Sequence, residues 1–177
     1  MIPYKHIIRR ETPHMRKETI LAAYAAIGEA TPLKTNCGLL CNAACCAVDS
    51  DGQGGVTLLP GEQELMGETE WGVLAPDPQM NLPFLTCHGP CDRDRRPFFC
   101  RIFPLCPVIG KNGKWTVRMD ARARAVCPLS RSPLAGLDPD FLSGVCRAVQ
   151  IIASDPEGEA VLRKWAALEA EFRKPLW

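Results

Sequence analysis

The sequence contains no long apolar run, and none of its stretches approaches the roughly 18 residues that a membrane-spanning helix requires. An excess of charge of either sign is also missing, since 21 lysines and arginines are balanced by 20 aspartates and glutamates. The chain therefore has no overall positive field that would attract nucleic acid. Aromatic residues make up only 7% of the chain, whereas 14 glycines and 16 prolines indicate many loops. We expect a loop-rich protein that neither crosses a membrane nor binds nucleic acid.

Histidine is scarce, and the glycine motifs of phosphate loops and dinucleotide-binding folds are absent. Only His6, His14 and His88 occur, and His88, next to Cys87, is the one histidine placed to act as a ligand or proton carrier. No histidine pairs with an asparagine or aspartate in a pattern that would activate a nucleophilic cysteine. These absences disfavour a cysteine-nucleophile enzyme and leave open whether the protein is an enzyme at all.

Cysteine, in contrast, is abundant, and stability does not explain its abundance. A chain of 177 residues can bury a core without covalent cross-links, yet this one carries ten cysteines. Its N-terminal basic residues resemble a signal peptide only loosely, because Glu11 and Glu18 lie among them. We expect a cytoplasmic protein, and in that reducing compartment a dense cysteine pattern indicates metal binding. A disulfide scaffold would be the alternative only if the N-terminus were cleaved on secretion.

Nine of the ten cysteines lie between positions 37 and 127 and form the predicted pool of metal ligands. They are Cys37, Cys41, Cys45, Cys46, Cys87, Cys91, Cys100, Cys106 and Cys127. On one straight helix Cys37 and Cys45 would lie roughly 12 Å apart, which is too far for both to bind one ion. Either Gly38 marks a loop that folds Cys37 back, or the cysteines serve two centres. The spacings fit neither common zinc ribbons nor common ferredoxins, so both iron and zinc stay open.

Arginines crowd the segment between Cys91 and Cys106. Arg96 and Arg101 are the predicted cofactor-binding residues, because a guanidinium group can offset the negative charge of a thiolate-bound centre. The alternative is that the arginines pair with neighbouring aspartates on a solvated face.

The fold class that these patterns predict is mainly α: a small, cysteine-rich domain organised by metal, with many loops and one short β-hairpin. Helices are expected at about 13–28, just after Pro60, at 138–153 and at 155–172. Prolines predict a loop over 71–85, and Asn112-Gly113 predicts a hairpin between 107 and 117. Cys146 falls on an apolar helical stripe and is expected in the core rather than at a metal.

Three parts are expected along the chain. They are an N-terminal helical segment (1–34), a cysteine-cluster metal-binding domain (35–130) and a C-terminal helical pair packing on it (131–177). No internal repeat or low-complexity segment is present.

The order of the motifs resembles a known family. The motifs are Cys37-x3-Cys41-x3-Cys45-Cys46, Thr57-Leu-Leu-Pro-Gly-Glu62, Cys87-x3-Cys91, Arg96-Pro97-x2-Cys100-Arg101-x-Phe103-Pro104 and Cys127-Pro128. Over residues 35–130 this order resembles the YkgJ-type cysteine-cluster family of zinc- or iron-chelating domains. The resemblance implies that the cysteines bind zinc or iron, the latter also as an iron–sulfur cluster, and it leaves the biochemical role open.

Two functions follow as hypotheses. The first is a protein that chelates iron, as the ion or as an iron–sulfur cluster, or zinc, with a redox or enzyme-supporting role. The second is a zinc-structured protein-interaction module without catalysis, in which the metal stabilises the fold and an unidentified protein partner binds the surface.

Overall fold

The structure is a computed structural model of the chain, and it describes residues 14–47, 54–67, 72–77, 80–89 and 91–174. The helices are α1 (Lys17–Ile27), α2 (Gly38–Cys41), α3 (Phe98–Ile102), α4 (Pro139–Ala153) and α5 (Pro156–Phe172). The strands are β1 (Gly55–Thr57), β2 (Gly72–Asp77), β3 (Leu82–Cys87), β4 (Leu105–Ile109) and β5 (Trp115–Met119). Short 3-10 helices are η1 (Ala44–Cys46), η2 (Glu62–Leu65), η3 (Arg93–Arg95), η4 (Arg122–Ala125), η5 (Pro128–Arg131) and η6 (Leu134–Gly136).

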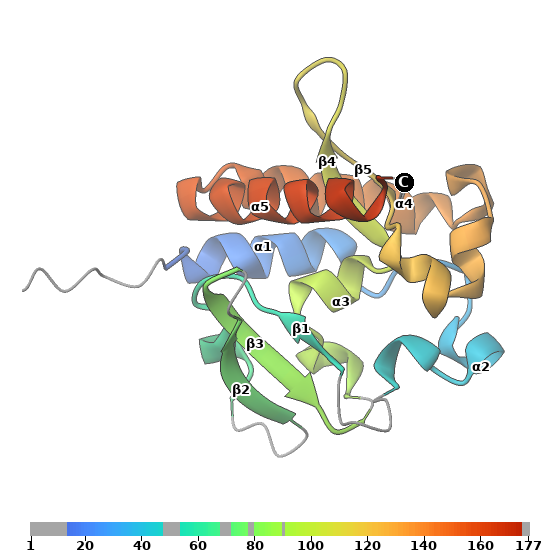
Figure 1. The fold of residues 1–177 in the computed structure, drawn as a ribbon, viewed down its shortest axis with the longest axis horizontal. Coiled ribbons are helices and arrows are strands. Elements are labelled where there is room, and N and C mark those ends of the chain that lie inside the picture. The colour runs from blue at the N-terminus through green and yellow to red at the C-terminus, as the bar shows by residue number, and fades with distance from the viewer. Residues whose placement is uncertain (1–13, 48–53, 68–71, 78–79, 90, 175–177) are drawn as a thin grey trace, which may run out of the picture.

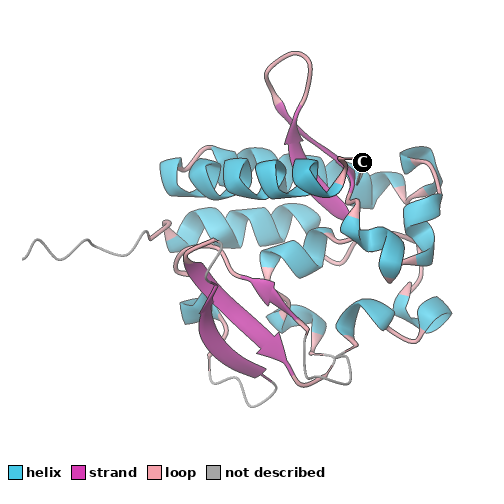
Figure 2. Cartoon of the chain, viewed as in Figure 1, coloured by secondary structure: helices cyan, strands magenta, loops and turns pink. Residues whose placement is uncertain are grey.

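The fold is mixed α/β, so the prediction of a mainly α protein with one hairpin is wrong. The strands form two antiparallel sheets, one in the order β1-β3-β2 and one of β4 and β5. In Figure 1, α4 and α5 lie on one side of α1 and the three-stranded sheet lies on the other. Figure 2 shows the helices and the two sheets as separate groups.

The three-stranded sheet forms where a loop was predicted, because β2 and β3 occupy most of residues 71–85. Pro76 and Pro83 oppose each other across the β2–β3 ladder. Pro76 lies on an edge strand, where a missing donor is tolerated. The Pro83 carbonyl accepts a hydrogen bond from the Leu58 backbone at 2.8 Å, just beyond β1. The prolines are therefore accommodated in pairing positions and do not prevent the strands from forming.

The terminal helices were predicted well where a side chain caps them. The Asp138 carboxylate accepts from the backbone of Asp140 and Phe141 at 2.9 and 3.1 Å, and α4 starts at the following proline. Asp155 caps α5 in the same way. The expected start of the first helix at residue 13 lies outside the described residues, while residues 14–16 are not helical and α1 begins at Lys17.

The predicted hairpin is confirmed. Strands β4 and β5 pair in register from Leu105↔Met119 to Ile109↔Trp115, and Gly113 in the turn has a φ of 73°, which favours glycine. The strands of the hairpin pack against α4 and α5, and its turn extends away from the helices (Figure 1). Among the described helices, none combines the length and apolar character needed to cross a bilayer.

One hydrophobic core joins all three predicted parts of the chain. It includes Ile20 of α1, Leu85 of β3 and Phe141 of α4, each of which is nearly or completely buried. Cys146 packs against this core, as expected. Helices α1 and α4 pack closely at Gly144, where an added Cβ would lie 2.8 Å from the Ala26 carbonyl oxygen.

Replacing Gly144 with alanine is therefore expected to force the two helices apart. We expect Gly144→Ala to lower the free energy of unfolding by about 1–3 kcal/mol, in spite of the better helix propensity of alanine. Gly136→Ala is the control, because its Cβ would meet only the Ser132 Cβ at 3.6 Å. Urea denaturation of both variants measures the difference, and a Gly144→Ala protein as stable as the control would contradict close helix packing.

Candidate metal centre

The first four thiols lie on a segment that folds back on itself. Helix α2 lasts one turn and stops because Asn42 and Ala43 both adopt the left-handed conformation, with φ of 50° and 51°. A 3-10 turn then carries Cys45 and Cys46. The single straight helix that would separate Cys37 and Cys45 does not form, although the break comes at Asn42 and not at Gly38.

The other thiols reach the same region from separate elements. Cys87 ends β3, Cys91 follows the next turn, Cys100 lies in α3, and Cys127 lies between η4 and η5. The Phe98 and Phe99 rings of α3 are buried, which fixes that helix against the core and holds Cys100 in place.

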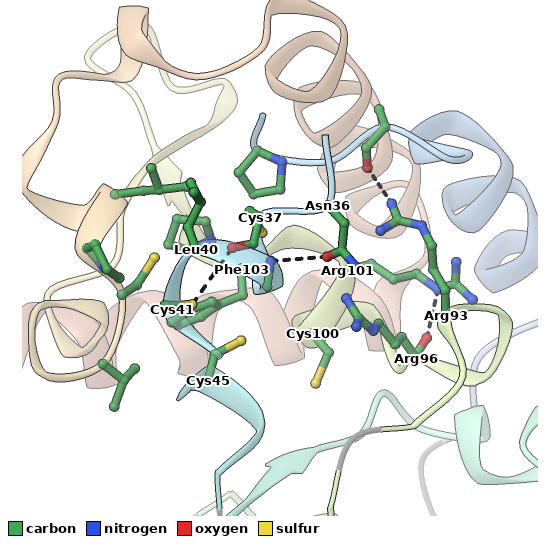
Figure 3. Close-up of a pocket in the computed structure, with 18 residues that line it drawn as sticks. Asn36, Cys37, Leu40, Cys41, Cys45, Arg93, Arg96, Cys100, Arg101 and Phe103 are labelled. Carbon is green, nitrogen blue, oxygen red and sulfur yellow. Dashed lines mark hydrogen bonds between the residues drawn. The ribbon is translucent and has the colours of Figure 1, made fainter. Parts of the chain in front are cut away.

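Eight of the nine predicted ligands line two adjoining cavities. The first, of about 70 Å³, is lined by Cys37, Cys41, Cys45, Cys100 and Cys127. The second, of about 430 Å³, is lined by Cys45, Cys46, Cys87, Cys91 and Cys100. Cys45, Cys100 and Arg96 belong to both cavities. Figure 3 shows the first cavity, with Cys37, Cys41 and Cys45 on one side and Cys100 and the arginines on the other.

Cys106 and His88 lie apart from this group. Cys106 is fully buried on β4 opposite Arg118, and burial followed by the charges of Asp120 and Glu169 raises the pKa of its thiol to about 12. His88 is exposed and lines neither cavity. The structure thus brings together eight thiols from four segments and separates one predicted ligand from them.

The eight thiols surround the cavities without converging on one point. Within the described part of the chain, no three histidine, cysteine, aspartate or glutamate side chains form a group that could hold a metal ion. All ten cysteines are unpaired thiols. The donor set itself is pure sulfur, which suits zinc or iron–sulfur centres.

Burial and mutual repulsion disfavour negative charge on most of these thiols. Burial raises the pKa of Cys37, Cys87 and Cys91 and raises that of Cys100 well above its usual range. Neighbouring thiols raise the pKa further: the pKa of Cys100 is raised by charge repulsion from Cys87, Cys46 and Cys91. Several thiolates could coexist here only with compensating positive charge.

Cys45 and Cys46 behave as a pair. The hydrogen bond between the two thiols raises the pKa of Cys45 and lowers that of Cys46. At Cys46, burial raises the pKa of the thiol, whereas the Arg96 guanidinium lowers it further. One sulfur of the pair thus ionises more easily because the other remains protonated.

Arg96 is the cation best placed to stabilise thiolates. It lowers the pKa of Cys37, Cys46 and Cys91 against the effect of burial. Its Nε is buried and has no hydrogen-bond partner in the described part of the chain. A buried, unpaired guanidinium nitrogen among thiols is costly unless negative charge develops beside it. This is the one arginine whose placement matches the predicted cofactor-binding role.

Arg101 is instead held by the protein backbone. Its Nε donates to the Arg96 carbonyl and its Nη2 to the Asp94 carbonyl, each at 2.7 Å. Its guanidinium carbon lies 4.0 Å from the centre of the Tyr24 ring. Arg101 lines the first cavity, but its hydrogen bonds fix the η3–α3 corner that presents Arg96.

A residue that sequence reasoning did not single out, Glu62, lies beneath this corner. Its carboxylate is fully buried and accepts from the backbone of Phe98 at 2.6 Å and of Leu59 at 2.8 Å, and from the Tyr24 hydroxyl. Burial raises the pKa of Glu62, while these hydrogen bonds lower it. In the sequence Glu62 stands out only as the last residue of the Thr57–Glu62 motif, which gives no sign that the carboxylate is buried.

Comparison of the chain with known protein families, with curated proteins and with solved structures yields no match.

Glu62 is expected to be essential for anchoring α3. In Glu62→Gln the amide nitrogen would face a donor, so we expect the free energy of unfolding to fall by about 1–3 kcal/mol. Glu64→Gln is the matched control, because the side chain of Glu64 is exposed and is hydrogen-bonded to that of His14. Chemical denaturation of the two variants makes the comparison, and equal stabilities would show that the buried carboxylate is not needed.

Proposed function

We propose that this protein binds a metal centre through the eight thiols that line the two cavities. The metal is iron, as the ion or in an iron–sulfur cluster, or zinc. The observation that carries the proposal is Arg96, whose buried Nε has no partner among the described residues and whose charge favours the thiolate form of three of these cysteines.

Electrostatics explains why a metal would be bound here. Thiols ligate only as thiolates, and burial holds most of these thiols in the protonated form. A metal cation supplies the missing positive charge, and Arg96 offsets the excess negative charge of an all-thiolate centre. The two thiols that line both cavities, Cys45 and Cys100, could serve either one centre or two.

The resemblance to chelating cysteine-cluster proteins supports the same function, as does the purely sulfur donor set. When bound, an iron–sulfur centre would supply one-electron chemistry, whereas zinc would supply structural cross-linking. An iron–sulfur centre would suit a redox or enzyme-supporting role. A cytoplasmic location completes the proposal, because a reducing compartment keeps ten free cysteines available as ligands.

A second candidate function is the zinc-structured interaction module, and one observation favours it. Leu39 and Leu40 of α2 are 81% and 70% exposed directly beside Cys37 and Cys41. Exposed leucines that border the thiols would give a protein partner an apolar contact. In that case the metal would hold the one-turn helix α2 in a shape that the partner recognises.

The direct test is to measure iron, zinc and sulfide in protein purified without oxygen, together with its absorption spectrum. The double variant Cys45→Ser/Cys100→Ser removes the two thiols that line both cavities and is expected to lose most of its bound metal. Cys106→Ser/Cys146→Ser is the matched control and should keep the wild-type metal content, because neither thiol lines a cavity.

Iron with sulfide would support the redox role, and zinc alone would support the interaction module. Wild-type protein that stays folded and holds neither metal, even after both are added under reducing conditions, would refute both. Equal loss of metal in the two double variants would place the ligands elsewhere.

A further inference from the structure

The larger cavity continues beyond the thiols into an aromatic chamber. Its far wall consists of Phe84, Phe99, Trp165, Leu168 and Phe172, with Arg122 beside them. These residues come from β3, α3, η4 and α5. The volume of about 430 Å³ falls within the range of pockets that bind small organic molecules.

Helix α5 has an apolar stripe that the core covers only in part. Val161 and Leu162, near its start, are buried in the core. Trp165, Leu168 and Phe172, further along the same stripe, line the cavity, and Phe172 is 60% exposed. The second half of the stripe thus presents apolar surface to the cavity.

Planar groups in the chamber already form a stack. The Phe99 and Trp165 rings lie 4.0 Å apart at an angle of 14°. The Arg122 guanidinium lies 4.3 Å from the centre of the Trp165 ring and 5.8 Å from that of Phe172. Asp120 fixes Arg122, accepting from its Nε at 3.0 Å and from its Nη2 at 2.6 Å. A flat ring placed beside Arg122 and Phe172 would extend this stack.

The one cation at the aromatic wall of the cavity, Arg122, is paired with a carboxylate, and the cavity's other arginine, Arg96, also lines the thiol cavity. Arg122 is paired with Asp120, and Asp77 accepts a hydrogen bond from the Thr57 hydroxyl at 2.9 Å. A paired guanidinium does not require an anion, and the carboxylate of Asp77 in the same lining disfavours one. The chemistry of the chamber therefore favours a ligand without net charge on its ring system.

We propose that the aromatic chamber binds an uncharged, planar aromatic molecule of two or three fused rings, of the kind found in flavins. The ring system stacks beside Arg122 and Phe172 and contacts the edge of Trp165. Because five thiols line the same cavity, the bound ring would share that cavity with part of the thiol cluster. The proposal concerns binding alone and does not require that a metal be present.

Riboflavin is the probe, and quenching of its fluorescence in a titration with the full chain is the measurement. We expect saturable quenching with a dissociation constant of the order of 10 μM. Phe172→Ala should weaken binding about tenfold or more. Because Phe172 is exposed, this change should have little effect on the free energy of unfolding. Trp165→Leu should weaken binding to the same extent. Trp115→Leu is the matched control on the β4–β5 hairpin, outside this cavity, and should leave the affinity unchanged.

Absence of saturable quenching up to about 1 mM probe would overturn the proposal. So would equal effects of Trp165→Leu and Trp115→Leu, or binding that Phe172→Ala leaves intact. Thermal denaturation of each variant identifies any loss caused by misfolding. Metal content measured on the same samples keeps this outcome separate from that of the metal-binding proposal.

Discussion

The buried carboxylate of Glu62 is the interaction on which the thiol region depends. It joins three parts of the chain, because it receives hydrogen bonds from α1 through Tyr24, from the segment between β1 and η2 through Leu59, and from the start of α3 through Phe98. A buried charge is tolerated only when its acceptors are satisfied, so these donors are held together as a unit. Helix α3 carries Cys100 and begins two residues after Arg96, so the carboxylate sets the position of both relative to the other thiols.

Arg101 extends this arrangement toward the surface. Its guanidinium lies over the Tyr24 ring and donates to two carbonyls of the η3 segment, so the same tyrosine supports both the buried carboxylate and the arginine. The consequence is a division of roles between two arginines that the sequence presents as equivalent. Arg101 donates from its Nε and Nη2 to backbone carbonyls, whereas the Nε of Arg96 is buried and has no partner within the described ranges.

The sequence predicted features that depend on local signals. The aspartate–proline pairs before α4 and α5 and the Asn112-Gly113 turn act within a few residues, and these elements formed as expected. The β2–β3 pair was missed because each proline was judged alone, whereas in the sheet Pro76 lies on an edge strand opposite Pro83. The separation of Cys106 from the other thiols depends on its place opposite Arg118 in the hairpin, which cysteine spacing does not reveal. The density of cysteines was readable from sequence, but the burial of Glu62 was not.

The larger cavity connects the thiol cluster with the aromatic chamber. The thiols lie on short, irregular segments whose shape the hydrophobic core fixes only through α3 and β3, whereas the aromatic chamber is built on α5 and on buried residues such as Phe99. The chamber is therefore the more rigid end, and the α2–η1 segment, with its exposed leucines, is the end with fewer packing contacts. Because the eight thiols do not converge on one point, ligation of a metal would require side-chain movement, and this segment is where such movement costs least. A metal centre formed there would bring α2 and η1 toward Cys100, and it would reshape the cavity from the thiol end while the aromatic wall stays in place.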